Sequence, residues 1–510
     1  MTTVLNNNII TKLSDRDHLL KRPGMYIGSV RPETTQSYFY NSTTGKFEYK
    51  SYQYIPGLIK IICEIIDNSL DEADRTNYQY ATNISIDITD TTVQIKDDGR
   101  GVPLDIDKAT GLSMLELAFT HAKAGSNFDD DVKKLIGTNG VGSFATNCFS
   151  KVFNVESCTG TKKGVLKCTD NLKDYKYTLT KGSKKNIGTT VFFEPDLAKF
   201  GQTIIDETHK SIIYQRLLFL AVSFPAIKFT FNKKPIVFKN SKSLMETFDD
   251  NYVVVDSDNY MIGIIPNNTD DFLQVSYING LDLKKGGNHI DYIHSEIVTR
   301  LKDKLSRKYK DIKPGDIKNK LQYVVIFKNF PKPEFDSQTK VQLTNATSDI
   351  KTFLSDVDWD KLTVNLMKKD AIINPIIDTY KIKEELKLRQ TLKTATKGSR
   401  NFKCEKYIPA TGSKKMYLLI CEGDSAVGGC SEAFGRDGIG YYSSKGVPLN
   451  GYVAPVQKIM NNVEFTDIIK ILNLQLNGQM QQLDYQYVIL ANDQDADRIS
   501  HKRTLFRIFY

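Results

Sequence analysis

The residues best suited to chemistry stand in EIIDNSLDEAD, residues 64–74. Glu64 and Asn68 lie four positions apart in an apolar run, so on a helix they share one face and look into the same cleft. A carboxylate and an amide on one face can hold a water molecule and a metal ion. The segment therefore predicts a helix that lines a reaction site.

A second segment, GTNGVG at residues 137–142, is suited to binding phosphate. Its glycines let backbone N–H groups approach phosphate oxygens, and the next residues can begin a helix whose positive end faces the anion. The P-loop pattern GxxxxGK[ST] does not occur, so phosphate binding has to come from elsewhere. Alone, the segment also fits a tight turn before a buried helix or a loose dinucleotide fingerprint.

Two shorter segments complete the expected site. In DDGRG, residues 97–101, Asp98 lies between a predicted strand and two glycines, where a carboxylate can accept a hydrogen bond from an exocyclic amine. Asp97 alone is interpreted as a turn residue. The segment GTT, residues 188–190, supplies another bend and a hydroxyl at a strand edge, which is ambiguous by itself.

These four segments, in the order in which they follow along the chain, resemble the Bergerat ATP-binding fold of the GHKL family, which contains gyrase, Hsp90, histidine kinases and MutL. The resemblance implies that Glu64 is the general base that deprotonates the attacking water and that Asn68 binds the magnesium ion. It implies that Asp98 recognises the adenine amine, helped by Thr189 through water. The other residues expected to contact ATP lie in the two glycine-rich loops: Gly99, Gly101, Asn139, Gly140, Val141 and Gly142, the lid being formed by Gly140 and Gly142.

Three further motifs narrow the resemblance to type IIA DNA topoisomerases: KRPGMYIGS at residues 21–29, NGLDLKKGGNHI at 279–290 and FDSQTK at 335–340. The last is similar to a loop of the family's transducer domain. That likeness implies that Lys340 reaches the terminal phosphate, as a catalytic and nucleotide-binding residue, and that Gln338 assists. A lysine is a chemically sensible point-charge ligand for phosphate. Outside this context, a lysine in a loop would mean nothing.

A second chemical site is predicted near the C-terminus. Two apolar, strand-like runs, MYLLIC and YVILAN, precede Glu422 in CEGDSA and the segment DQDAD. Alternate residues of an extended segment point the same way, so the carboxylates of DQDAD converge. Charges about 4 Å apart repel by roughly 4 kcal/mol at an effective dielectric near 20, which favours a divalent cation. The three carboxylates are those of Asp493, Asp495 and Asp497.

An EF-hand loop is excluded for DQDAD, because its sixth and twelfth positions hold Arg498 and Thr504 in place of Gly and Glu. The pattern instead resembles the TOPRIM domain of topoisomerases and primases. This implies that Glu422 is a general acid/base of strand cleavage and, with the three aspartates, a ligand of Mg²⁺. The sequence departs from the family pattern at Arg498, with His501 displaced, and at Lys445 and Val447.

The chain stops 13 residues after Asp497 and has no recognisable domain for a cleavage tyrosine. We therefore expect a small partner subunit to supply the tyrosine and a further polypeptide to complete TOPRIM, as in the split enzymes of T-even-like phages. A truncated or frame-shifted chain would look the same. Alone, the chain is expected to hydrolyse ATP without cutting DNA.

The elements that must position these residues follow an α+β pattern rather than strict βαβ repetition. A long helix from Asp360 to about Leu392 is expected to kink or break at Pro375. The expected domains are a GHKL ATPase sandwich at 1–230, a ribosomal-S5-like transducer at 231–392, a basic connector at 393–415 and an incomplete α/β TOPRIM domain at 416–510.

Composition fits a cytosolic protein, in the bacterial host if the chain is phage-encoded. Hydrophobic residues make up 40% and charged residues 25% of the chain, and no apolar run approaches the roughly 20 residues that span a bilayer. The seven cysteines lack CxxC spacing, which argues against a zinc site and a disulfide framework. The net charge of +9 is mild and gives poor support for nucleic-acid binding by itself.

Local basic clusters bear more directly on DNA. Residues 301–320 hold eight Lys or Arg against three Asp, and the connector adds Lys397, Arg400, Lys403 and Lys406. These residues fit either a solvated helix face or contacts with the phosphates of a transported duplex.

The function expected from these features is an ATP-operated, Mg²⁺-dependent clamp that dimerises and passes one DNA duplex through a transient break in another. Two alternatives stay open: a non-cleaving clamp of the MutL or Hsp90 kind, and an inactive, truncated topoisomerase subunit. The sequence does not distinguish relaxation from supercoiling.

Overall fold

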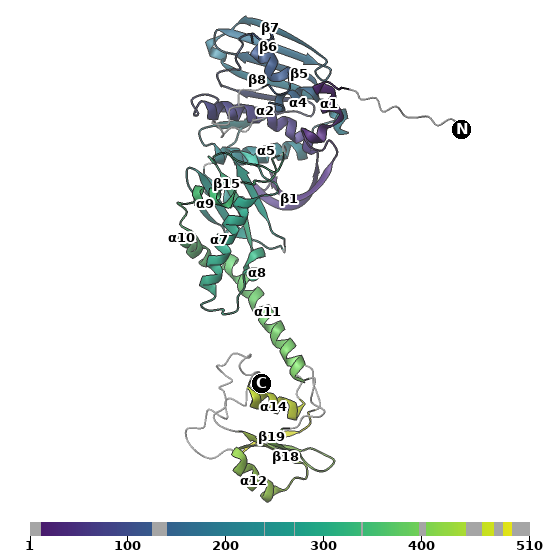
Figure 1. Cartoon of the computed structure of the whole chain (residues 1–510), viewed down its shortest axis with the longest axis vertical. Coiled ribbons are helices and arrows are strands. Elements are labelled where there is room, and N and C mark those ends of the chain that lie inside the picture. Colours follow the sequence, from purple (N-terminus) through teal and green to yellow (C-terminus); the bar gives the residue numbers. More distant parts are fainter. Residues whose placement is uncertain are drawn as a thin grey trace, which may run out of the picture. The chain divides into compact units, whose positions relative to one another are not determined.

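The structure is a computed structural model of the 510-residue chain. It describes residues 12–124, 140–238, 240–269, 271–337, 340–396, 404–444, 462–473 and 483–491, without the side chains of 388–396. The chain divides into two compact units, Met1–Ile376 and Ile377–Tyr510, whose elements are labelled in Figure 1.

The first unit begins with an eight-stranded sheet in the order β10-β9-β3-β4-β8-β5-β6-β7. All neighbouring strands in it are antiparallel except β3 and β9. Its strands are β3 (Asn83–Ile88), β4 (Val93–Asp97), β5 (Ser150–Cys158), β6 (Lys162–Thr169), β7 (Asp174–Lys181), β8 (Gly188–Pro195), β9 (Lys228–Phe231) and β10 (Lys234–Pro235). The domain boundary expected at residue 230 therefore falls inside β9, and this sheet continues to Pro235.

Helices pack against one face of this sheet and share its core. They are α1 (Asp15–Lys21), α2 (Pro56–Arg75), α3 (Met114–Thr120), α4 (Gly142–Cys148) and α5 (Glu207–Ser223). Pro56 at the first position of α2 has the backbone angle that a helix start requires. Ile61, Ile62, Ile65 and Ile66 are almost fully buried, so the apolar face of α2 anchors the helix to the sheet.

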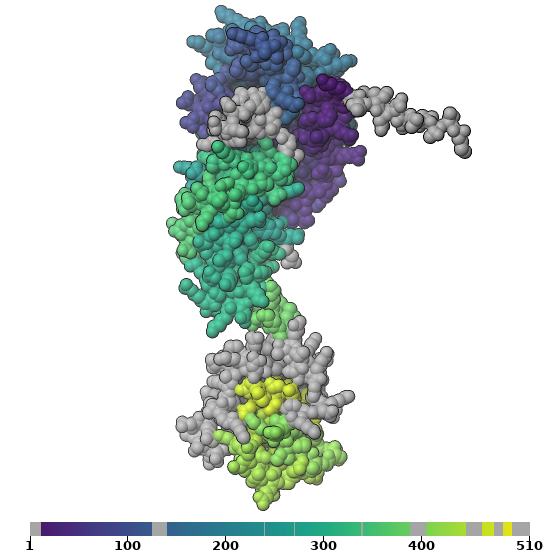
Figure 2. Space-filling view, in the orientation of Figure 1, coloured from purple at the N-terminus to yellow at the C-terminus, as the bar shows by residue number. Residues whose placement is uncertain are grey.

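A hairpin of β1 (Glu33–Asn41) and β2 (Lys46–Tyr54) joins the two halves of the first unit. The hydroxyl of Tyr38 in β1 donates to Gln322 at 2.6 Å, and the amide of Phe47 in β2 donates to the Thr247 carbonyl at 2.7 Å. In Figure 2 the purple and teal parts of the chain accordingly abut. Short 3-10 turns complete this half: η1 (Pro23–Met25), η2 (Lys184–Asn186) and η3 (Leu197–Phe200).

The second half of this unit is built on a five-stranded sheet in the order β11-β12-β15-β13-β14. Strand β15 is buried along its whole length and is the centre of the core. The strands are β11 (Val253–Asp256), β12 (Tyr260–Pro266), β13 (Gln274–Ile278), β14 (Leu281–Asp282) and β15 (Leu321–Phe327). The helices are α6 (Ser241–Glu246), α7 (Asn288–Leu305), α8 (Pro314–Ile317), η4 (Lys318–Lys320), α9 (Thr347–Phe353) and α10 (Trp359–Met367). Helix α11 (Asp370–Thr396) begins in this unit, and its residues from Ile377 onward belong to the second unit.

The helix expected to break at Pro375 breaks earlier, between α10 and α11. Pro375 lies inside α11, where it removes one backbone hydrogen bond. The helix continues through it, because Ile372, Ile373 and Ile376 are buried and hold this turn against the core. The sequence-based expectation of a break at the proline was therefore wrong by about two turns of helix.

The second unit contains a four-stranded sheet in the order β16-β18-β17-β19. Its elements are β16 (Tyr407–Ile408), β17 (Tyr417–Glu422), α12 (Gly423–Phe434), β18 (Ile439–Ser444), α14 (Val463–Leu472) and β19 (Tyr487–Ala491). Strands β17 and β19 hold most of the apolar runs MYLLIC and YVILAN and are parallel neighbours. The middle of β17 is buried, whereas β19 lies at the end of the strand order and exposes Tyr487 and Ile489.

In the part of the chain that the structure describes, no helix is long and apolar enough to cross a bilayer. All seven cysteines are free thiols, which agrees with the expected lack of disulfides.

Candidate functional site

A cavity of about 1120 Å³ opens in the first unit, and segments far apart in the sequence line it. It is bounded by one face of α2, the end of β4, the start of α4 and the start of β8. Glu64, Asn68, Gly101, Thr189 and Lys340 all lie in its wall. Of the further residues predicted to contact nucleotide, Gly140, Val141 and Gly142 also line it. Asn139 and Gln338 fall outside the described residues.

Glu64 is the carboxylate at one end of the cavity. Its side chain is 19% exposed and forms an ion pair with Lys60, one helical turn earlier, at 2.5 Å. Burial alone would raise the pKa of Glu64, but the ammonium of Lys60, aided by Lys340 and Arg216, holds that pKa below its usual value. Glu64 is therefore ionised at neutral pH, which is the form in which a carboxylate can accept a proton from water.

Two neighbours hold the face of α2 against the start of α4. The side-chain amide of Asn68 donates to the hydroxyl of Ser143 at 2.9 Å, a contact that does not use the amide oxygen. Gly142 packs directly against Glu64. A methyl group at position 142 would therefore collide with the Glu64 carboxylate. Any larger side chain at Gly142 would displace this end of the site.

Gly140 has a different reason to be glycine. Its φ is +61°, and a Cβ would meet the backbone of Ala124. The carbonyl of Gly140 also accepts a hydrogen bond from the amide of Lys123 at 2.9 Å. These contacts hold the two ends of the segment around residues 125–139 together.

Lys340 brings a second cation to the Glu64 end from the second half of the unit. Burial lowers the pKa of Lys340, and the nearby Lys60 lowers it further, whereas Glu64 opposes the change. An anionic ligand between these two ammonium groups would relieve their repulsion, since opposite charges within a few Å favour each other in a partly buried site. This end of the cavity is therefore suited to phosphate.

Asp97 is the carboxylate at the other end, and it is 7% exposed. It accepts hydrogen bonds from the hydroxyl of Ser69 at 3.0 Å and from the amides of Gly99 at 2.9 Å and Thr189 at 3.4 Å. Burial raises its pKa to about 6, although these three donors lower it in part. The carboxylate has no cation partner among these contacts, which leaves its charge available to a ligand N–H group.

The expectation that Asp98 is the adenine-binding carboxylate is corrected. Asp98 is exposed and is not among the residues that line the cavity. Its side chain accepts hydrogen bonds from the backbone amide of Asn83 at 2.8 Å and from the Asn83 side chain at 2.5 Å. Successive residues of a strand point to opposite faces, so the end of β4 directs Asp97 inward and Asp98 outward.

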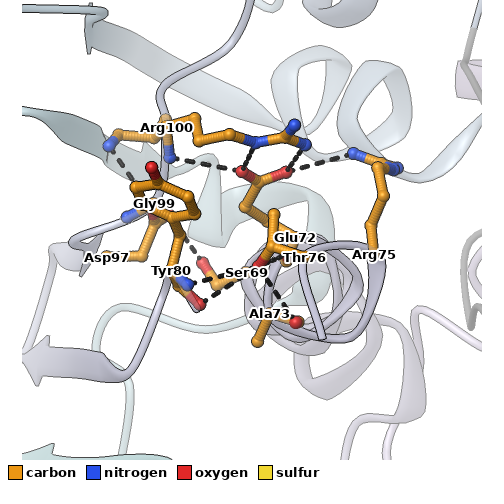
Figure 3. A network of polar contacts seen from close by, with 10 residues as sticks. Ser69, Glu72, Ala73, Arg75, Thr76, Tyr80, Asp97, Gly99 and Arg100 are labelled. Atoms are coloured by element: carbon orange, nitrogen blue, oxygen red, sulfur yellow. Dashed lines mark hydrogen bonds and ion pairs between the residues drawn. The ribbon is translucent and has the colours of Figure 1, made fainter. Parts of the chain in front are cut away.

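A network on α2 closes the Asp97 end of the cavity (Figure 3). Glu72 accepts two hydrogen bonds from the Arg100 guanidinium, at 2.8 and 3.1 Å, and one from the Arg100 amide at 3.2 Å. Arg75 approaches the same carboxylate at 3.3 Å. Gly99 lies between Asp97 and Glu72, and only glycine fits there because a Cβ would collide with both side chains. Sequence reasoning missed Glu72 and Arg100 because their pairing spans 28 residues.

Glu422 of the second predicted site belongs to the four-stranded sheet. It ends β17, where it stands opposite Ser444 of β18. Ala491 ends the parallel strand β19 and lies opposite Cys421, the residue before Glu422. Asp493, Asp495 and Asp497 themselves lie outside the described residues. Within the described ranges, no group of three or more His, Cys, Asp or Glu residues is arranged to hold a metal ion.

Comparisons with known proteins identify the relatives of this chain. A family model described as a histidine kinase-, DNA gyrase B- and HSP90-like ATPase matches residues 58–190, and one described as DNA gyrase B matches residues 236–396. Among solved structures, the ATPase region of Saccharomyces cerevisiae topoisomerase II is similar, with a TM-score of 0.66 and 28% identity. The likeness covers 73% of this chain and 99% of that structure.

Two curated relatives show how far the likeness extends. The DNA topoisomerase large subunit of Enterobacteria phage T4 is 34% identical over 477 residues, which cover 92% of this chain and 90% of that subunit. DNA topoisomerase 2 of Pisum sativum is 31% identical over 521 residues, which cover 95% of this chain. The chain spans only 34% of the length of that plant enzyme.

Proposed function

Because the chain belongs to the type II DNA topoisomerases and carries their ATPase domain, we propose that it is the large subunit that closes an ATP-operated clamp around duplex DNA. The observation that carries the proposal is that Glu64, Asp97 and Lys340 line one cavity. We assign them the roles of general base, acceptor for an adenine amine and phosphate-binding cation. The three come from α2, from β4 and from a loop of the second half of the unit.

Each of these residues has a separate role along the cavity. Asp97 accepts the exocyclic amine of adenine, and Thr189 supports it from β8. At the other end Glu64 orients a water molecule and takes its proton, and Lys340 offsets the negative charge of the terminal phosphate. Phosphoryl transfer depends mostly on positioning and charge neutralisation, which is what these groups provide. Ordering of Gly140, Val141 and Gly142 over the phosphates forms the lid.

The donor set also fits a magnesium ion. Glu64 is held ionised, and the contact of the Asn68 amide group with Ser143 does not use the amide oxygen, which can bind a cation. Mg²⁺ prefers such oxygen ligands and keeps several waters. Asn68 would hold it, and the ion would supply charge neutralisation between the phosphates. Glu64 stays the group that accepts the proton.

For the DNA half of the reaction we propose that Glu422 serves as general acid/base and metal ligand, with Asp493, Asp495 and Asp497 as the other ligands of Mg²⁺. The parallel pairing of β17 and β19, in which Glu422 ends β17 and Ala491 ends β19 two residues before DQDAD in the sequence, supports this. The cleavage tyrosine comes from a small partner subunit, and two copies of this chain dimerise through the ATPase domain.

A DNA-contacting surface is proposed for the basic cluster at residues 301–320, at the end of α7 and in the loop after it. Arg307, Lys308, Lys310 and Lys313 are exposed there. Contacts to phosphates release counterions, so binding of duplex DNA should weaken steeply as salt rises. DNA binding that barely changes between low and high salt would exclude this surface.

The test of the whole proposal uses the full chain with Mg²⁺. ATP hydrolysis is measured with and without duplex DNA, and relaxation of supercoiled DNA is measured after the tyrosine-bearing partner is added. We expect DNA-stimulated hydrolysis by the chain alone and relaxation only with the partner. Lys340→Met should reduce strand passage more than nucleotide binding. A chain that hydrolyses ATP but leaves DNA supercoiled beside its partner would contradict the topoisomerase half of the proposal.

A further inference from the structure

One buried arginine of α5 stands behind the nucleotide cavity and contacts both halves of the first unit. Arg216 is 6% exposed and forms an ion pair with Asp67, which is 3% exposed. The same terminal nitrogen of Arg216 donates to the carbonyl of Gly280 at 3.0 Å. Asp67 lies on α2, between Glu64 and Asn68, whereas Gly280 lies in the turn between β13 and β14.

The turn that contains Gly280 supports the first leg of the Lys340 loop. Asn279 accepts a hydrogen bond from the amide of Phe330 and donates to the Phe330 carbonyl, both at 2.9 Å. The turn packs closely against α5 and the residue after it, since a Cβ at Gly280 would collide with Leu220 and Phe224. The φ of Gly280 is +83°, which also favours glycine. The chain then runs from Phe330 to Lys340.

The second leg of the loop is held by the segment that follows the same turn. Gly286 accepts a hydrogen bond from the amide of Leu343 at 3.0 Å, and a Cβ at Gly287 would collide with the Leu343 backbone. The side chain of Asn288 donates to the carbonyls of Thr344 and Asn345, at 3.3 and 2.9 Å. Residues 279–288, which we call the cradle, therefore contact both ends of the Lys340 loop.

We propose that Arg216 is a positioning residue for ATP hydrolysis: it fixes the helix of Glu64 to the cradle of the Lys340 loop. The inference rests on the proposed ATPase function and identifies Arg216 as the residue that fixes the position of Glu64 relative to Lys340.

The experiment compares three variants of the full chain. Arg216→Lys keeps the buried charge but carries it on a shorter side chain, whose ammonium does not reach as far as the terminal nitrogen of arginine that contacts Asp67 and Gly280. Asp67→Asn with Arg216→Met removes both charges, so no charge is left buried and unpaired. Arg300→Lys is the control, because Arg300 pairs with Glu296 on the surface of α7 and does not line the cavity.

For each variant, kcat and KM for ATP are measured together with the dissociation constants of ADP and of a non-hydrolysable ATP analogue. Small misplacements of catalytic groups cost up to about a hundredfold, so we expect kcat to fall by about tenfold or more in both Arg216 variants. Affinity for the analogue should fall about fivefold and affinity for ADP should stay within twofold, because only the analogue reaches Lys340. The Arg300 control should match the wild type.

The ratio of the two affinities separates positioning from a purely structural role. A variant that merely unfolds in part would lose ADP and analogue binding equally, and this result would overturn the inference. Wild-type kcat and a wild-type affinity ratio in both Arg216 variants would overturn it as well while leaving the proposed function intact. A wild-type chain that neither binds nor hydrolyses ATP would overturn both.

Discussion

Each end of the nucleotide cavity holds a carboxylate, and the groups around the two carboxylates differ in charge. Glu64 faces the ammonium groups of Lys60 and Lys340, and the net result is a pKa below its usual value. Asp97 accepts hydrogen bonds from neutral donors, the hydroxyl of Ser69 and two backbone amides, and burial together with the nearby Glu72 carboxylate raises its pKa to about 6. Both side chains are largely removed from water, so the charged neighbours, and not burial, make the difference.

This contrast assigns different work to the two groups. A carboxylate beside two cations stays ionised through the physiological range and is suited to a reaction in which anionic charge moves. A carboxylate beside neutral donors keeps an uncompensated charge that a ligand N–H group can satisfy, which is suited to recognition. The changes below test this division, beginning with the largest expected effect.

The strongest test of the division is Glu64→Gln, which removes the base and keeps its shape. We expect kcat for ATP to fall by about a hundredfold to ten-thousandfold, the usual contribution of a general base. Binding of a non-hydrolysable analogue should change by only a few-fold. Glu48→Gln, on the exposed strand β2, is the matched control. Turnover near the wild-type rate would remove Glu64 from the chemical step.

Asp97→Asn tests the recognition end. Asparagine keeps an oxygen for the Gly99 amide and an amide group that can donate to Ser69, so the fold should persist. Loss of a charge-assisted hydrogen bond costs about 1.5–3 kcal/mol, so affinity for ATP should fall roughly tenfold to a hundredfold, with kcat at saturation nearly unchanged. Calorimetric titration measures the affinity. A fall in kcat without a fall in affinity would break the comparison.

The raised pKa of Asp97 also predicts a pH dependence of stability. The folded protein keeps this proton up to a pKa of about 6 and the unfolded chain only to about 3.8, so the folded state binds more protons between these values. The free energy of unfolding therefore falls as pH rises through this window, by on the order of 2–3 kcal/mol from this group.

The measurement uses the single tryptophan, Trp359, which lies in α10 of the first unit. Its fluorescence during urea unfolding, at several pH values between 4 and 7, gives the stability of wild type and Asp97→Asn. The decline should be missing from the variant, and titrating groups common to both proteins cancel in the difference. Equal slopes would show that Asp97 titrates normally.

Asp98→Asn should have the smallest effect. Asp98 is exposed and bonds only to Asn83 among the contacts described for it, apart from a long contact with Thr82. We expect affinity for ATP to stay within twofold of the wild type and the melting temperature to change slightly. A loss of ATP affinity as large as that of Asp97→Asn would reverse the assignment of the two neighbours.

Local spacing was enough to predict the Glu64 end of the cavity. Glu64 and Asn68 share a face of α2 because helical periodicity places residues four apart together. The same spacing relates Lys60 to Glu64 and could have revealed that ion pair. Alternation along β4 likewise places Val93, Ile95 and Asp97 on one face, so the signal that favours Asp97 over Asp98 was present and was overlooked.

Other contacts had no local signal. Arg216 and Asp67 are separated by 149 residues, and Arg100 and Glu72 by 28, so only the folded chain brings them together. The continuation of α11 through Pro375 was also beyond sequence reasoning, because it depends on the burial of the neighbouring isoleucines against the core. Long-range packing decides these features, and propensity does not.

Gly142 and Glu64 cannot change independently over evolution. The Cβ of any other residue at position 142 would occupy the place of the Glu64 carboxylate, whose flexible tip would swing aside while the fold survived. Substitution at Gly142 would therefore leave the protein folded but move the Glu64 carboxylate out of the position in which it accepts a proton. A shorter acid at position 64 together with alanine at 142 would restore the fit in shape, so an aspartate and an alanine at these positions are expected to occur together.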